Sequence, residues 1–394
     1  MKFLSLILLS LLCLESQAYP LAKQVHLVPY NCKSCDLLSH EELSLSWPTH
    51  DSPLQTQTMH EQTSRKYQVK ASLKELRQGV TIHTSAAEAI VRIAPVNPKT
   101  SVKLQFSISN KHGLNLSLLE ASSLYSQREA LKNTPFAGNT LALAELKPEL
   151  GFGQFTITSS QADRSKDDEL FMIHVYDRYA ATALTIQTNK ARYYSGDEFV
   201  ATLILKDKEQ IYSIDDLTLS LVSPDGEITP LVATPIAENI FQARTILNSE
   251  KNSRGGNWYV DATVTTIIGD DIIWRQAHSA FSYTIPSAAV VNITKGPANN
   301  FDFIATVEVA TGSRYALQAV LLGSDTQGKL HPIQTTQSAA WLPTGQQRLN
   351  FSFDSNLKTD YKAPYYLSYI HLTDFGQMKP VFEFDAPIEV DKLS

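Results

Sequence analysis

Short runs of strand-forming residues, separated by turn residues, constrain the fold of this chain more than any other feature. From Ala183 onward apolar and polar residues alternate in runs such as ALTIQTN, EFVATLIL, LTLSLVS, NIFQARTI and WYVDATVTTI. A period of two residues is typical of strands that bury one face. Ser-Pro-Asp-Gly at 223–226 and Gly-Asp-Asp at 269–271 lie between the runs and favour tight turns. The sequence therefore predicts an all-β (mainly β) protein.

Breaks in the strand pattern divide the chain into three β-rich domains in tandem. Pro286 ends one series of strands, and a second series fills the residues after it. About seven strands in roughly 105 residues is the size of an immunoglobulin-like sandwich. We expect a β-rich N-terminal domain over residues 19–182 and immunoglobulin-like sandwiches over 183–286 and 287–394. We also expect the sandwich of 183–286 to fold alone.

Two segments of the N-terminal domain have the apolar spacing of helices, Ala71–Gln78 and Leu116–Lys132. We predict helices there and strands in most of the remaining residues. The segment YDRYAATAL connects the first two domains without Gly or Pro. We read it as a stiff connection, in which Tyr176 and Tyr179 pack at the domain interface.

The first 18 residues have the pattern of a secretory signal peptide. Lys2 supplies a positive charge, residues 3–14 are almost entirely apolar, and the small residues Ser16 and Ala18 form a cleavage site. The apolar run is too short to cross a bilayer as a helix. We therefore expect an exported protein, periplasmic or secreted.

Cleavage after Ala18 would leave Tyr19 as the first residue of the mature chain. The alternative is a lipoprotein signal with Cys13 as the anchor. That processing prefers a small residue before the cysteine, whereas this chain has Leu12. We favour ordinary cleavage and keep the lipoprotein as the alternative.

Composition excludes some partners. The formal net charge is −6 at pH 7, with no cluster of Lys and Arg, and this argues against a nucleic-acid ligand. No run after the signal approaches the roughly 20 apolar residues of a membrane helix. We therefore expect no membrane span in the mature chain.

Cys32 and Cys35 form a C-x-x-C pair, the arrangement that most resembles chemistry. Export favours a structural disulfide, which closes a short loop and stabilises the fold by about 2 kcal/mol or less. A metal site would need about four ligands, and His26 and His40 are the first candidates to join the pair. A redox motif would need a strand before it and a helix after it. We favour the disulfide, and the metal and redox alternatives remain open.

Catalytic motifs are incomplete throughout the chain. GSDTQGKL, at 323–330, has the glycine and lysine spacing of a phosphate loop, but His331 and Pro332 follow where a helix should begin. We predict a hairpin turn there. No G-x-S-x-G elbow occurs. We therefore predict no catalytic residues and no cofactor.

Several segments resemble known proteins. ARYYSGDEFVATLIL resembles the opening of an immunoglobulin-like domain common in exported bacterial proteins. SRYALQAVLLGSDTQGKLHPIQTTQSAAWLPTGQQRLNFSFD resembles the C-terminal domain of a gammaproteobacterial family of exported proteins of unknown function. VTIHTSAAEAIVRIAPV and ELFMIHVYDR resemble parts of that family's N-terminal domain. The resemblance implies a three-domain, β-rich exported protein, and it carries over no catalytic residues.

Two classes of function remain. The first is a non-catalytic binding or adhesion protein that presents its β-domains to an unknown protein or glycan ligand. The alternative is an exported enzyme or metal-binding protein with its site in the N-terminal domain, which holds seven of the ten histidines. We favour binding, because the alternative needs His, Asp or Cys side chains that converge in one pocket.

Overall fold

The computed structural model describes residues 19–21, 26–49, 60–100, 104–131, 133–134, 140–160, 166–207, 210–249, 254–269, 271–298, 300–356 and 360–393. The signal peptide predicted for residues 1–18 lies outside these residues. The described strands pair antiparallel in open sheets, as the sequence predicted. The chain forms two compact units. We name them the C-terminal unit (Met1–Thr56, Asn248–Gly256 and Tyr283–Ser394) and the two-domain unit (Gln57–Leu247 and Asn257–Ser282).

The C-terminal unit is a sandwich of two sheets around one apolar core. One sheet has the order β1 (Tyr19–Pro20), β23 (Ala288–Lys295), β24 (Asp302–Val309) and β27 (Gly345–Ser352). The other has the order β2 (Leu43–Pro48), β26 (Leu330–Leu342), β25 (Ser313–Ser324), β28 (Lys362–Asp374) and β29 (Lys379–Phe384), with β30 (Ile388–Glu389) also on β28. A 3-10 turn, η4 (Val390–Lys392), follows. The predicted turn at GSDTQGKL joins β25 to β26.

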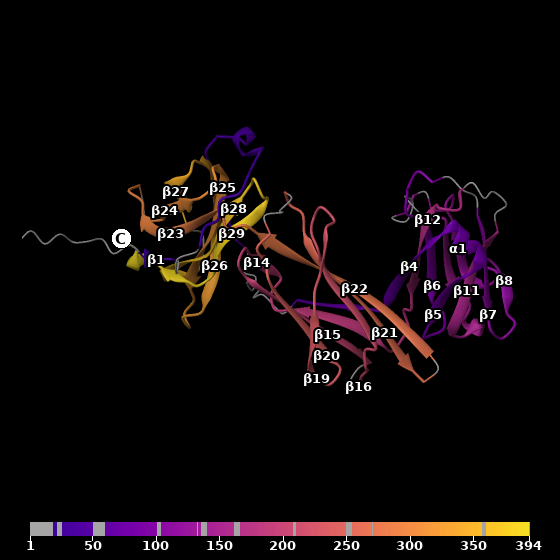
Figure 1. Ribbon diagram of the computed structural model, residues 1–394. Helices are drawn as coiled ribbons and strands as arrows, with labels where there is room; N and C mark the ends of the chain where they lie inside the picture. The colour runs from indigo at the N-terminus through magenta and orange to yellow at the C-terminus, as the bar shows by residue number, and fades with distance from the viewer. Residues whose placement is uncertain are drawn as a thin grey trace, which may run out of the picture. The chain divides into compact units, whose positions relative to one another are not determined.

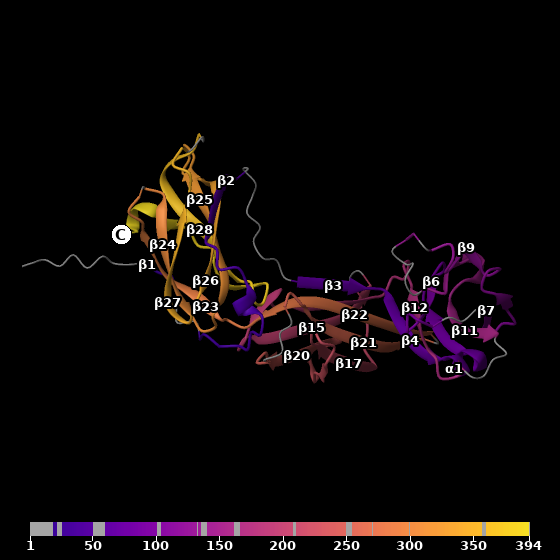
Figure 2. The same ribbon diagram turned by 90° about the horizontal axis from the view of Figure 1, so that it is seen from above.

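The N-terminal segment supplies an edge strand to each sheet of this sandwich. Tyr19 pairs with Ile293 at the edge of one sheet, and Leu43 pairs with Ala339 at the edge of the other. Figure 2 shows β2, drawn in indigo, beside the orange strands β25 and β26. Our predicted N-terminal domain of 19–182 included this segment, whereas the structure places residues 19–21 and 26–49 in the C-terminal unit. Sequence order alone does not reveal such pairing, because the two strands are short and their partners are hundreds of residues away.

A buried carboxylate ties the segment to the sandwich. Asp374 is fully buried and accepts hydrogen bonds from the hydroxyl of Tyr30 (2.8 Å) and the backbone N–H of Gly376 (2.7 Å). Its other donors are the hydroxyls of Ser287 and Ser313 and the amide of Gln377. A buried charge is tolerated only when such donors replace water. Asp374 therefore holds Tyr30 in place through an interaction that would be expensive to break.

The C-x-x-C pair lies in the same segment and forms a disulfide. Cys35 is buried and begins a 3-10 turn, η1 (Cys35–Leu37). Its carbonyl oxygen accepts a hydrogen bond from Trp341 Nε1 (3.1 Å), and its sulfur lies 3.2 Å from Ser313 Oγ. A disulfide sulfur carries no hydrogen, so Ser313 keeps its own hydroxyl hydrogen for Asp374. The disulfide thus packs beside the carboxylate that anchors Tyr30.

We expect Tyr30→Phe to lower the free energy of unfolding of the C-terminal unit by about 1–3 kcal/mol, because Asp374 loses a donor that water cannot replace. Urea unfolding of the full mature chain, followed by near-ultraviolet circular dichroism, measures the change. Tyr179→Phe removes a hydroxyl from a side chain that is 61% exposed and should leave the transition in place. Equal effects of the two substitutions would contradict an anchoring role for Asp374.

Lys379 is a second buried charge in this unit. Its side chain is 4% exposed, and its ammonium group donates to the carbonyl oxygen of Tyr283 (2.8 Å). Burial lowers the pKa of Lys379 to about 8, because the charged form loses its hydration. In the unfolded chain the same group titrates near 10.5.

Between those two pKa values the unfolded chain binds more protons than the folded chain, so the stability of the fold rises with pH. We expect the wild type to gain stability relative to Lys379→Met as the pH rises from about 8 to about 10.5. The control, Lys392→Met, changes an exposed lysine and should show a constant difference from the wild type. Denaturant midpoints at several pH values measure both; a flat profile for Lys379→Met would refute the lowered pKa.

The first domain of the two-domain unit packs two sheets around its own core. One layer contains β4 (Lys66–Ser72), β12 (Leu170–Tyr176), β6 (Ile90–Pro95), β10 (Ala142–Leu146) and β9 (Ser122–Gln127). The other contains β5 (Val80–Thr84), β11 (Gly153–Ser160), β7 (Gln105–Asn110) and β8 (Asn115–Ser117), and a 3-10 turn, η2 (Pro148–Leu150), precedes β11. Figure 1 shows the two layers side by side.

One of the two predicted helices exists. It is α1 (Leu73–Gln78), and it begins with a capping box in which Ser72 Oγ accepts from the Glu75 N–H and the Glu75 carboxylate accepts from the Ser72 N–H. The helix predicted for Leu116–Lys132 is wrong, because its described residues form the end of β8 and then β9. Leu118 and Ala121 are both buried by a single turn, and their spacing imitates a helix.

The central sandwich includes a strand, β3, that lies outside the boundaries we predicted for this domain. One sheet has the order β19 (Ala233–Ala237), β20 (Ile240–Ile246), β15 (Glu198–Asp207), β13 (Ala183–Thr188) and β3 (His60–Ser64), and β16 (Gln210–Ile211) pairs with β15. Ser64 of β3 pairs with Leu184, so residues 183–286 do not contain the complete sheet. Figure 2 shows β3 leading into β4 of the first domain.

The two domains also share the second sheet. It runs β18 (Ile228–Pro230), β17 (Asp216–Val222), β21 (Trp258–Ile268) and β22 (Asp271–Thr284), with β14 (Arg192–Tyr194) also on β22. β22 then pairs with β4 of the first domain, where Gln276 lies opposite Lys66. The outer sheet of the first domain and this sheet therefore form one continuous sheet across the two-domain unit.

Candidate functional site

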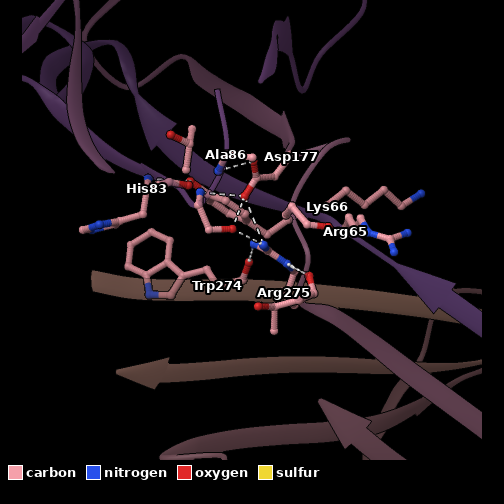
Figure 3. Close-up of polar contacts among 12 residues, drawn as sticks. Arg65, Lys66, His83, Ala86, Asp177, Trp274 and Arg275 are labelled. Atoms are coloured by element: carbon pink, nitrogen blue, oxygen red, sulfur yellow. Dashed lines mark hydrogen bonds and ion pairs between the residues drawn. The ribbon is translucent and has the colours of Figure 1, made fainter. Parts of the chain in front are cut away.

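A buried ion pair fixes the place where the two domains share their sheet. Asp177 follows β12 in the first domain, and Arg275 lies in β22 of the central sandwich. Their side chains are 0% and 1% exposed, and the Arg275 guanidinium lies 3.0 Å from an Asp177 carboxylate oxygen. Figure 3 shows the two side chains facing each other. A charge removed from water at this depth needs such a partner.

Neighbouring groups complete the hydrogen bonding of the pair. The Asp177 carboxylate accepts from the backbone N–H and hydroxyl of Ser85 (2.7 and 2.6 Å) and from the Ala86 N–H (3.2 Å). Arg275 also donates to the carbonyl oxygens of Thr182 (3.1 Å) and Trp274 (2.7 Å). Burial lowers the pKa of Arg275, and the charge of Asp177 opposes that effect. The network joins residues of both domains.

Aromatic packing strengthens the same junction. The Trp274 ring, on the neighbouring residue of β22, makes edge contacts with the rings of Tyr67 and His83 in the first domain (centroids 5.5 and 4.9 Å apart). Tyr67 OH donates to the carbonyl oxygen of His83 (2.8 Å) and accepts from its N–H (2.7 Å). Burial lowers the pKa of His83, opposed by Asp271, so a neutral ring packs there at pH 7.

The outer face of the continuous sheet forms a groove above this junction. Strand alternation turns Tyr67 and Val175 into the core and the residues beside them outward. In one row across the sheet, Lys66 lies between Gln276 and Tyr176. We call this hollow the sheet-face groove; its volume is about 550 Å³, and its outward side chains are Lys66, Gln68, Arg92, His174, Tyr176, Asp261, Thr263, Gln276 and His278.

The groove is held in a fixed shape by its own contacts. The side-chain amide oxygen of Gln276 accepts from the backbone N–H of Gln68 (2.9 Å), which continues the strand pairing where the β22–β4 ladder ends. Arg92 Nε donates to Thr140 Oγ1 (2.8 Å). A binding surface whose side chains are already positioned loses little entropy when a ligand arrives.

The electrostatics of the groove are asymmetric. Lys66 and Arg92 carry positive charge, and His174 lies opposite Arg92 in the next strand. Burial first, and then the charges of Arg92 and Lys66, lower the pKa of His174, so its ring is neutral at pH 7. Asp261 is the carboxylate among the described lining residues, and it lies beside His278. Two cations and one carboxylate leave the described lining of the groove with a net positive charge.

The groups that line the groove can form hydrogen bonds and charged contacts. The described lining residues offer cations, amides, a hydroxyl and the ring of Tyr176, which is 46% exposed. A hollow of this size could hold part of a larger ligand.

The four residues proposed for the C-x-x-C site lie in the C-terminal unit, and none of them lines the groove. Cys32 and Cys35 are bonded to each other, and the ring of His40 stacks on Trp341 (centroids 4.7 Å apart). His26 is exposed. Within the described ranges, no three His, Cys, Asp or Glu side chains gather at metal-binding distance. His50 lies outside the described residues.

The sequence missed the residues that define the junction. We predicted that Tyr176 and Tyr179 pack at the domain interface, and this is wrong, because they are 46% and 61% exposed. Asp177, between them, is buried instead. A usable signal was present in IIWRQAHSAF, where Arg275 has the same strand phase as the buried residues Ile273 and Ala277. A charged residue at a core position predicts a buried partner.

The fold defines a class of multidomain β-proteins, in which a β-rich domain precedes two sandwiches. Family models for domains of unknown function match in the same order: the DUF4785 N-terminal domain at residues 34–177, the central domain at 180–284 and the C-terminal domain at 287–391. The chain belongs to the DUF4785 family, which confirms the three-domain resemblance seen in the sequence. Residues 34–49 fall in the N-terminal family model but lie in the C-terminal unit.

A solved structure supports this assignment. A DUF4785 family protein from Legionella pneumophila is 37% identical, with a TM-score of 0.80, over 95% of this chain and 99% of that chain. Alpha-2-macroglobulin from E. coli is 13% identical over 76% of this chain and 20% of that chain, with a TM-score of 0.31. A tandem repeat from a large adhesion protein is 13% identical over 82% and 74% of the two chains, with a TM-score of 0.22. The last two likenesses are too weak to carry an argument.

A comparison with curated proteins gives no match. No helix in the described part of the chain is long and apolar enough to cross a membrane.

We expect Asp177→Asn to lower the free energy of unfolding of the two-domain unit by about 3–5 kcal/mol, because it leaves the Arg275 charge buried without its partner. Glu198→Gln is the control: its ion pair with Arg244 is exposed, so the change should stay within about 1 kcal/mol. Urea unfolding of the full chain measures both.

The double variant Asp177→Leu/Arg275→Met removes both charges and should recover part of the loss seen on removing Asp177 alone. If the losses measured for Asp177→Leu alone and Arg275→Met alone add up to the loss of the double variant, Asp177 and Arg275 do not depend on each other, and the ion pair does not hold the junction.

Proposed function

We propose that this protein is an exported, non-catalytic binding protein that recognises its ligand in the sheet-face groove. The observation that carries the proposal is the groove itself: a hollow of about 550 Å³ whose outward side chains are polar and whose remaining charge is positive. Any sheet face that is exposed to water carries polar residues, so polarity alone does not indicate a binding site. A concave face with fixed side chains is the usual form of a binding site. The fold by itself implies no function.

The position of the groove supports binding. It spans strands of two domains, from β6 of the first to β21 of the central sandwich, and binding sites occur preferentially where domains meet. The ion pair beneath it, Asp177 and Arg275, and the ring of Trp274 hold those strands together. A ligand would therefore meet a surface that has already been assembled by folding.

Export is supported by the pattern of residues 1–18 and by the disulfide. A charged start, an apolar run and small residues at 16 and 18 direct proteins to secretion. The Cys32–Cys35 disulfide suits an oxidising compartment, periplasmic or extracellular. On this proposal the ligand is a protein or a glycan met outside the cytoplasm.

We expect Lys66→Gln/Arg92→Gln to lose the binding shown by the wild type when mature chains starting at Tyr19 are screened against immobilised glycans and periplasmic or secreted proteins. The double substitution removes the two positive charges that line the groove. The matched control, Lys111→Gln/Lys329→Gln, removes the same charge from exposed positions outside it. Equal binding by all three proteins would place the ligand elsewhere and reject the proposal.

Mass spectrometry of the exported protein should find Tyr19 at its N-terminus.

A further inference from the structure

We propose that the ligand of the sheet-face groove is an acidic oligosaccharide whose sugar rings bear carboxylate groups. This inference rests on the proposed function and specifies its ligand. The chain as a whole has a net charge of −6, whereas the described lining of the groove carries a net positive charge. Such a hollow attracts anions.

The two cations are spaced for a ligand longer than a single ion. Lys66 lies on β4 and Arg92 on β6, with β12 between them. Arg92 is in the row of His174, two residues along β12 from Tyr176, which is opposite Lys66. With strands ~4.8 Å apart and ~3.4 Å per residue, their Cα atoms are separated by about 12 Å. A groove of about 550 Å³ also exceeds one carboxylate or phosphate.

The surface between the cations is suited to sugar hydroxyls. Gln68 and Thr263 offer an amide and a hydroxyl group, which donate and accept hydrogen bonds, whereas the Gln276 amide is already bonded to the backbone of Gln68. Tyr176 presents a half-exposed ring at the end of the row that contains Lys66. An aromatic ring with a polar tip packs against the apolar face of a sugar ring while its hydroxyl remains hydrated. These groups match a ligand with alternating polar edges and apolar faces.

An acidic peptide fits the groove less well. Peptides commonly bind to a β-protein by adding a strand to an open sheet edge. The groove lies on a sheet face, where β12 has a paired strand on both sides, and β4 pairs with β12 along one side and with β22 at Lys66 on the other. The apolar lining side chains, such as Val175 and Ala277, point into the core and leave no pocket for an apolar anchor residue.

Nucleic acid also fits poorly. Binding of single strands combines several stacking rings with a groove of several cations. The described lining residues of this groove include two exposed rings, those of Tyr176 and His278, and two cations, Lys66 and Arg92, with one carboxylate, Asp261. An acidic oligosaccharide requires fewer stacking rings and fewer cations than a single-stranded nucleic acid.

The test uses the mature chain, residues 19–394, and titration calorimetry with defined oligogalacturonates, their methyl esters and oligoglutamate. The esters keep the sugar rings and lose the charge. We expect the oligogalacturonate to bind, and its methyl ester to bind at least about tenfold more weakly because charge-assisted contacts are lost. Raising the salt concentration should weaken the oligogalacturonate complex, since exposed charges are screened.

Lys66→Gln/Arg92→Gln should weaken oligogalacturonate binding at least about tenfold, and Lys66→Gln alone should weaken it by a smaller factor. Lys111→Gln/Lys329→Gln should change it less than about twofold, since these lysines are exposed elsewhere. Thermal unfolding confirms that each variant is folded. Lys66 is exposed, so its single substitution keeps the test valid if the Arg92 change disturbs the fold.

The remaining outcomes separate the ligand class from the function. Equal binding of the ester and the acid overturns the role of charge, and oligoglutamate that binds as tightly as the oligogalacturonate overturns the choice of a sugar. In both cases groove-dependent binding still supports the proposed function. Failure of oligogalacturonate to bind overturns the acidic-sugar class. Only when the wider glycan and protein screen also shows no groove-dependent binding does the proposed function fail as well.

Discussion

The buried ion pair between Asp177 and Arg275 is the constraint on which the two-domain unit depends. Two adjacent β-domains could each close their own sheets and remain joined only by a linker. Here β22 extends the sheet of the first domain, and Arg275 brings a charge into the interior that Asp177 balances. Separation of the domains would break the ion pair between Asp177 and Arg275. It would also remove the contacts of the Trp274 ring with Tyr67 and His83. The first domain and the central sandwich therefore form one compact unit.

A second constraint is that neighbours in space are not neighbours in the chain. The N-terminal segment closes one edge of each sheet in the C-terminal unit, and β3 completes a sheet of the central sandwich before the first domain begins. Edge strands carry unpaired backbone groups that invite association with other chains. Covering those edges with strands of the same chain satisfies the groups internally. Tyr30, bonded to Asp374, and the disulfide beside it keep the covering segment in place.

Much of the architecture was predictable because strand period and turn chemistry are local. The central and C-terminal sandwiches, the helix near Leu73 and the hairpin at Gly323–Leu330 all follow from residues close in sequence. The strand exchanges do not, since β1 and β3 are short and their partners are remote. The groove was equally hidden: alternation shows that Lys66, His174 and Gln276 face solvent, but not that β4, β12 and β22 are adjacent. The misread Leu116–Lys132 segment shows that one buried turn can imitate a helix.

The groove and the ion pair are consequences of the same alternation. Every outward side chain of β4, β12 and β22 has an inward neighbour, so Lys66 is exposed next to buried Tyr67, and Gln276 is half-buried next to fully buried Arg275. Backbone hydrogen bonds set the spacing of the strands, and the inward residues hold β22 beside β4, so both determine the distances between the outward groups. Substitutions at Asp177 would therefore shift β22 relative to β4 and change the shape of the groove. Substitutions at Lys66 would change the charge of the groove and leave the fold intact, because its side chain contributes charge to the surface and little to the core. The stability of the junction and the charge of the groove thus depend on opposite faces of the same strands.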